Sequence, residues 1–166
     1  MTRNPASAHI VVLFGAMANF EGSATLDTEA SHLASVLAAA SSPPTLTAIS
    51  LGLTQSIRTA SHHLRLDDVA PSPVDRALAS LGAVSLHDWA ARFPIGRLCN
   101  SLGPADQGRV FWRTLRRSPA AVRALQAADL VIATDLATAK TGWIAVHRGW
   151  ARSAVYDPRS AATAAG

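Results

Sequence analysis

Short apolar runs and longer segments of helical period alternate along the chain. The run at residues 9–14, HIVVLF, is continuous and rich in β-branched residues, which is typical of a strand buried on both faces of a parallel sheet. Further strands are predicted at 45–52, 82–87, 130–134 and 151–157. The stretch 53–73 has no clear period, and we expect a long connection or an irregular insertion there.

Helices are predicted between these strands. One has Leu26, Ala30, Leu33, Leu37 and Ala40 at steps of three and four. Others are expected from Val74 to Ser80, from Ala105 to Arg117 and from Pro119 to about Ala127, with Ser118 as cap and Pro119 in the first turn.

The last predicted helix begins at about Leu136. Its apolar residues form one stripe, made of Leu136, Ala139, Trp143, Val146 and Trp150. Gly142 would let this helix approach a neighbour closely.

Alternating strands and helices predict an α/β fold, a Rossmann-like three-layer sandwich with a mostly parallel sheet. The 166 residues suit a single domain, with an ordered core over about 8–158 and a flexible tail at 159–166.

Composition narrows the class of protein. Hydrophobic residues make up 49% and charged residues 16%, and no apolar run is long enough to span a bilayer. The single cysteine, Cys99, excludes an internal disulfide framework and is expected to be a small buried hydrophobe. The apolar run near the N-terminus is too short for a signal peptide, so we expect a cytoplasmic protein. The net charge of +4 comes almost wholly from arginine, as in many proteins encoded by GC-rich genomes, and does not establish a nucleic-acid partner.

Two strand ends are candidate ligand sites, because ligands of open α/β sheets bind where strands give way to helices. The first is the loop from Gly15 to Gly22, including Asn19; it lacks the glycine spacing of dinucleotide and P-loop sites, and is either a turn or a sugar or phosphate contact. The second is Thr134 with Asp135, which either cap the following helix or contact ligand.

Other candidates have structural alternatives. Four arginines, Arg109, Arg113, Arg116 and Arg117, share one helical face, either solvated or docking to phosphates, an acidic partner or an anionic membrane. Lys140 is expected to point to solvent. His62 and His63 stand near Asp67 and Asp68, but no familiar metal-ligand spacing occurs, so we expect no metal and no cofactor. No catalytic signature occurs.

The stretch ADLVIATDLATAKTGWIAVHRGWARSAVYDPRSA, with the first strand, its loop and LDTEASHLASVLAAA, resembles the N-terminal, acceptor-side domain of GT-B glycosyltransferases of the family-4 type. The resemblance implies that Gly15 and Gly22 lie in the loop facing the interdomain cleft and that Asp135 ends the fourth-strand motif. The family often has histidine where this chain has Ile132 and Thr134.

In that family a second Rossmann-like domain binds the nucleotide-sugar, and this sequence ends after VYDPRSAATAAG. We therefore expect a glycosyltransferase-like domain that lacks a donor-binding half and needs a partner, or a homo-oligomer, for sugar transfer. The alternatives are a stand-alone nucleotide- or anion-binding module, and an interaction protein that uses the basic helix face or an exposed tryptophan stripe.

Overall fold

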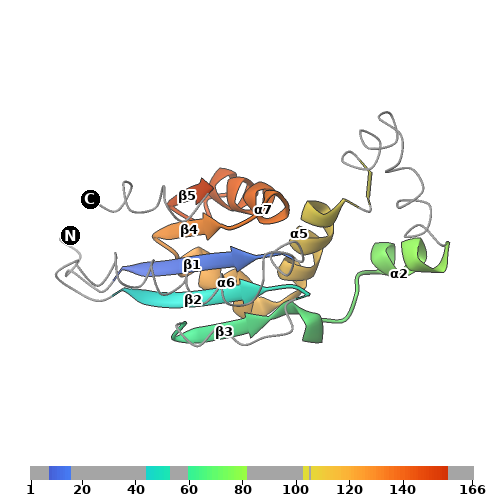
Figure 1. Ribbon diagram of the computed structural model, residues 1–166, viewed down its shortest axis with the longest axis horizontal. Helices are drawn as coiled ribbons and strands as arrows, with labels where there is room; N and C mark the ends of the chain where they lie inside the picture. Colours follow the sequence, from blue (N-terminus) through green and yellow to red (C-terminus); the bar gives the residue numbers. More distant parts are fainter. Residues whose placement is uncertain (1–7, 16–43, 53–59, 82–102, 105, 157–166) are drawn as a thin grey trace.

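The computed structural model describes residues 8–15, 44–52, 60–81, 103–104 and 106–156. Five parallel strands form one sheet in the order β3-β2-β1-β4-β5 (Figure 1). They are β1 (His9–Phe14), β2 (Thr45–Ser50), β3 (His62–Arg65), β4 (Leu130–Ala133) and β5 (Ser153–Tyr156). The fold class is therefore α/β and Rossmann-like, as the sequence predicted, with a sheet that is parallel throughout.

The strand β1 lies at the centre of the sheet. It pairs with β2 on one side, where Ile10 is opposite Leu46, and with β4 on the other, where Ile10 is opposite Leu130. Its residues from Ile10 to Phe14 are at most 2% exposed. This burial on both faces explains why the run is apolar without alternating.

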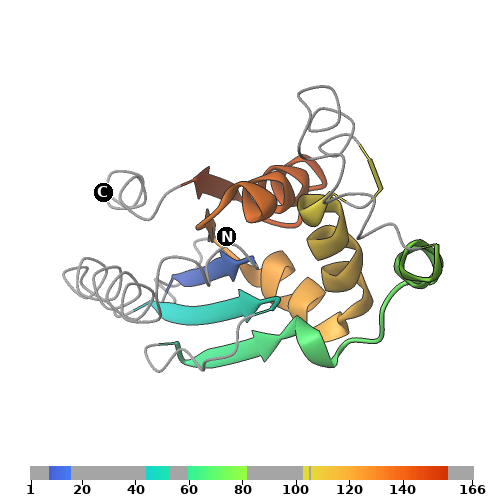
Figure 2. The same cartoon turned by 45° about the vertical axis from the view of Figure 1, so that its right-hand side comes forward.

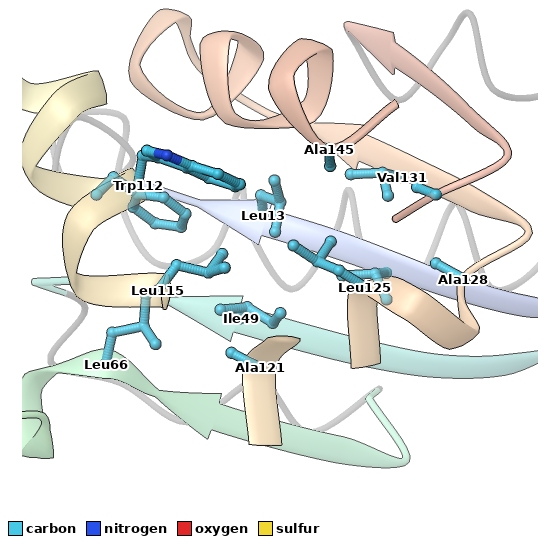
Figure 3. Packing of buried hydrophobic residues seen from close by; sticks show 13 residues of the cluster. Leu13, Ile49, Leu66, Trp112, Leu115, Ala121, Leu125, Ala128, Val131 and Ala145 are labelled. Atoms are coloured by element: carbon cyan, nitrogen blue, oxygen red, sulfur yellow. The ribbon is translucent and has the colours of Figure 1, made fainter. Parts of the chain in front are cut away.

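Three helices cover one face of the sheet: α5 (Gln107–Arg117), α6 (Pro119–Ala127) and α7 (Leu136–His147). Their side chains meet Leu13 and Ile49 of the strands in one apolar cluster (Figure 3). Leu115 of α5, Leu125 of α6 and Ala145 of α7 are fully buried there. The opposite face presents a second buried cluster, which includes Val12, Phe14 and Ile132.

The short helix α2 (Pro73–Ser80) lies beside α5 and away from the sheet (Figure 2). None of its own residues is buried. It is held by polar contacts: Arg113 of α5 forms an ion pair with Asp75 and donates to the carbonyl of Pro104 at 2.7 Å. Ser72, the residue that caps α2, accepts from the Asp75 N–H at 3.1 Å.

Most predicted elements are confirmed within a few residues, and one prediction is wrong. The stretch 53–73 was expected to be irregular, but it contains β3 and a 3₁₀ turn, η2 (Leu66–Asp68). The sequence HHLR hid this strand because an edge strand is only half buried and needs no apolar run. The predicted helix over 26–40 and the predicted strand at 82–87 lie outside the described residues.

The apolar stripe predicted on α7 faces the core only in part, since Val146 and Trp150 pack against the core cluster and Leu136 and Trp143 do not. Leu136 is 80% exposed and Trp143 is 60% exposed, whereas the buried residues are Thr138, Thr141, Gly142 and Ala145. Small residues form the contact surface because the helix sits close to the sheet. A methyl group at Gly142 would lie 3.4 Å from the Ala154 Cβ, so the expected close approach is confirmed.

None of the helices in the described part of the chain has the length and apolar character needed to span a bilayer.

Candidate functional site

The strand order reverses direction between β1 and β4. From β1 the chain builds outward through β2 and β3, and β4 is followed by β5 on the other side. In open α/β sheets ligands bind at such a switch point, beyond the carboxyl ends of the strands. Here the two strand ends are Gly15 and Thr134 with Asp135, so the structure brings together two candidates that are about 120 residues apart along the chain.

Asp135 caps α7. Its Oδ1 accepts a hydrogen bond from the backbone N–H of Thr138 at 2.8 Å. The Thr138 hydroxyl oxygen in turn accepts from the Asp135 N–H at 3.2 Å, which completes a capping box. The Oδ2 atom accepts from the Gly15 N–H at 2.9 Å. Asp135 therefore caps α7, which was one of the two roles expected for it. The same carboxylate also holds the end of β1 through the Gly15 N–H.

Gly15 is buried and leaves no room for a side chain. A methyl group at this position would lie 2.5 Å from the Asp135 Oδ2 and 2.9 Å from its Oδ1. The glycine is thus required by close approach of the carboxylate. Thr134 closes the other side of the junction, because its hydroxyl donates to the Leu13 carbonyl at 2.9 Å and its N–H donates to the same oxygen at 3.2 Å.

Two further backbone amides at this edge also donate to carboxylates. The Gly52 N–H, after β2, donates to Asp67 at 2.8 Å. The Arg109 N–H, in the first turn of α5, donates to its cap Asp106 at 3.0 Å. Amides of this kind hold phosphates in nucleotide-binding folds. In this chain they bind its own side chains.

The first turns of α5 and α7 lie against each other. A methyl group at Gly108 would be 3.0 Å from the Ala137 carbonyl oxygen, so a side chain here would require the two helices to move apart slightly. Lys140 was expected to point to solvent, but its Nζ lies 3.4 Å from the Asp106 carboxylate and its side chain is 40% exposed. No spacing in the sequence predicts this pair, because Lys140 of α7 and Asp106, the cap of α5, are 34 positions apart.

Two of the four arginines on α5 contact other parts of the chain, and the other two are exposed. Arg113 is committed to Asp75, and the Nε of Arg117 donates to the Ala70 carbonyl at 3.1 Å, so both tie α5 to the preceding segment. Arg109 and Arg116 are exposed. The four arginines therefore do not act as one uniform phosphate-binding surface.

The neighbouring histidines take different positions on β3. His62 is exposed, whereas His63 is half buried with its Nε2 2.8 Å from the hydroxyl of the fully buried Ser50. Burial lowers the pKa of His63, the Arg65 charge lowers it further, and Asp67 partly opposes the change. No group of three or more metal-ligating side chains gathers among the described residues. Asn19, Gly22 and Cys99 lie outside them.

Comparison with protein-family models, curated proteins and solved structures gives no match to this chain.

Proposed function

We propose that this chain is a glycosyltransferase-like, acceptor-side domain that binds a hydroxyl-bearing ligand at the sheet edge between Gly15 and Asp135. A partner supplies the donor-binding half in this proposal.

One observation carries the proposal: a carboxylate stands at the topological switch point. A carboxylate offers about four acceptor positions. Within the described residues, Asp135 uses Oδ1 for the first turn of α7 and Oδ2 for the Gly15 N–H, which leaves a position on Oδ2. This oxygen can accept a hydrogen bond from a sugar hydroxyl.

Aspartate side chains already accept hydrogen bonds from backbone amides at this edge of the sheet, which argues against a nucleotide- or anion-binding module. A phosphate at this edge would have to displace Asp135 or Asp106 from the helix it caps, and it would meet their negative charge. A neutral polyol meets neither obstacle.

Ligand screening by thermal shift and calorimetry tests the binding step. We expect neutral mono- and oligosaccharides to stabilise the protein, by about 2.7 kcal/mol at a concentration of 100 times Kd, and phosphate and nucleotides to have no comparable effect. A response to nucleotides or phosphate without one to sugars would refute the polyol proposal and favour the anion-binding module.

Asp135→Ala should abolish sugar binding. Ser118→Ala is the matched control, because Ser118 also caps a helix, α6, without contacting Gly15 or Asp135. Each variant loses one helix cap, at a cost of about 1 kcal/mol, and Asp135→Ala also loses the contact with the Gly15 N–H. Binding is therefore compared at a temperature at which both variants are shown to be folded.

A transfer assay tests the need for a partner. We expect no turnover from the purified chain with nucleotide-sugars and a panel of sugar acceptors, because donor phosphate, anomeric carbon and acceptor must be held together. Turnover by the chain alone would refute the need for a partner, while leaving the ligand site in place.

A further inference from the structure

Basic residues outnumber acidic ones on the face of the sheet that α5, α6 and α7 cover. Residues 107–156 include eight lysine and arginine residues, two aspartates and no glutamate. Asp129 is half buried and accepts from the His9 N–H. Asp135 is half buried and already binds the Gly15 N–H and the first turn of α7. This part of the protein surface is therefore electropositive.

Three of these arginines lie around one pair of tryptophans. The rings of Trp112 in α5 and Trp150 after α7 have centroids 5.2 Å apart. The Arg148 guanidinium, at the end of α7, lies 5.3 Å from the first centroid and 6.0 Å from the second. Arg109 and Arg116 are exposed and stand three residues before and four residues after Trp112, so they are its neighbours along α5. Arg109, Arg116 and Arg148 form what we term the arginine cluster.

The arginine cluster keeps its positive charge. Within the described residues none of its three members is in an ion pair, whereas Arg113 and Lys140 each have an aspartate partner. A cation–π contact holds the Arg148 guanidinium in place without neutralising it. The cluster therefore presents three positive charges, one of which is fixed in position.

The side chains around the cluster distinguish between polyanionic partners. A protein interface needs an apolar core, and docking on an anionic membrane needs apolar side chains that enter it. No large apolar side chain of α5 or α6 is exposed. The exposed ones of α7 lie elsewhere, Leu136 in its first turn and Trp143 beside β5. A phosphate backbone needs only positive charge and hydrogen-bond donors, so the cluster suits nucleic acid best.

The geometry favours a DNA duplex over a single strand. Single-strand sites stack bases on accessible aromatic rings, but Trp112 is only 8% exposed. Arg109 and Arg116 are seven residues apart, which is about 10.5 Å along the axis of α5. That separation is similar to the width of the major groove of B-form DNA, about 12 Å, which has a phosphate backbone on each side.

We propose that the arginine cluster docks this protein on the phosphate backbones of duplex DNA without reading the base sequence. Arg109 and Arg116 bind phosphates on the two sides of the major groove, and Arg148 binds a neighbouring phosphate. This surface does not use Gly15 or Asp135, so neither this proposal nor the one for sugar binding depends on the other.

Fluorescence anisotropy of the full chain with a short labelled DNA duplex tests the proposal. Three phosphate contacts give a slope of about −2.7 in log K against log salt, so affinity should fall about 40-fold between roughly 50 and 200 mM salt. Arg109→Gln, Arg116→Gln and Arg148→Gln should each weaken binding and reduce the slope by about one.

Arg65→Gln is the matched control, because it removes the same charge from the opposite face of the sheet. Arg65 lies on that face since it is two residues after His63, the neighbour of Ala48 in the other apolar cluster. This variant should keep the salt slope of the unaltered chain. Melting temperatures of all four variants show that each is folded under the assay conditions.

Several results would overturn the proposal. A slope unchanged in the Arg109 and Arg116 variants, or reduced equally by Arg65→Gln, would mean that only net charge binds DNA. Tighter binding to a single strand or to an RNA duplex of the same sequence would identify another nucleic acid. Displacement of the duplex by polyglutamate at equal charge, or by vesicles of phosphatidylglycerol, would identify an acidic protein or a membrane as the partner.

Discussion

Thr138 and Thr141 are both fully buried on α7 and differ in hydrogen bonding. The Thr138 hydroxyl lies 2.9 Å from the Asp135 Oδ1 and 3.0 Å from the Asp135 carbonyl oxygen. The Thr141 hydroxyl has no partner within the described residues. A buried hydroxyl without a partner loses its hydration and regains nothing, so the same residue type has opposite effects on stability at the two positions.

Thr141→Val should raise the free energy of unfolding by about 1 kcal/mol, because valine keeps the shape and the branching and removes the unpaired group. Thr138→Val, the matched change, should lower it by about the same amount or more through loss of the capping box. Chemical denaturation of both variants measures the difference. Destabilisation by both would mean that the Thr141 hydroxyl has a partner.

Gly15 and Asp135 should be energetically coupled. Gly15→Ala should destabilise the protein strongly, since the new methyl group would lie 2.5 Å from the carboxylate oxygen. In an Asp135→Ala background that obstacle is gone, so the same glycine change should cost much less. A double-mutant cycle measures the coupling, and additive costs would contradict the contact.

At the scale of elements, α2 differs from the other helices because it is held by charge. It buries none of its own residues, and its main tie is the Asp75 to Arg113 ion pair. Burial alone would raise the pKa of Asp75, but hydrogen bonds from Arg113 and Ser72 and the guanidinium charge outweigh it, so this pKa is lowered.

The sign of that shift predicts how α2 responds to acid. A lowered carboxyl pKa contributes stability above the unfolded value of about 3.9 and loses it as pH falls through the lower, folded value. Amide exchange in α2 should therefore accelerate below about pH 4 relative to exchange in α6. Asp75→Asn should show the faster exchange already at neutral pH; unchanged exchange would show that another contact holds α2.

The helix α7 shows why a helical period can be read correctly and still mislead. The spacing of Leu136, Trp143 and Val146 predicts a helix, and the helix is there. Large apolar residues are normally expected on the core side. In α7 the residues buried against the sheet are small, whereas Leu136 and Trp143 are exposed and Val146 is half buried.

At the scale of the whole molecule, the central strand, the helix caps and the two strand ends at Gly15 and Asp135 could be predicted because each leaves a local signal. The run at β1, Ser118 before Pro119 and Asp135 after β4 are examples. Contacts between distant segments leave none. The pairs of Lys140 with Asp106 and of Arg113 with Asp75 are set by helix packing, and no spacing in the sequence encodes them.

Global stability should depend on pH through His63. Because its pKa is lowered in the folded state, the unfolded chain binds more protons just below its own value of about 6.5. Stability should therefore fall as pH decreases from about 6.5 toward the folded pKa. His63→Gln, which can still contact Ser50, should flatten this slope in denaturation curves, whereas His62→Gln leaves His63 intact and should keep it. A slope that survives His63→Gln would contradict the assignment.

The order of the strands also has a consequence for synthesis on the ribosome. The central strand β1 needs β4 as a neighbour, and the joined residues His9 and Asp129 are 120 residues apart. At about 5–20 residues per second, roughly 6–24 s separate the translation of these two strands. Through that interval one edge of β1, which is apolar from Ile10 to Phe14, lacks its partner, so we expect the nascent chain to be prone to aggregation until β4 has been made.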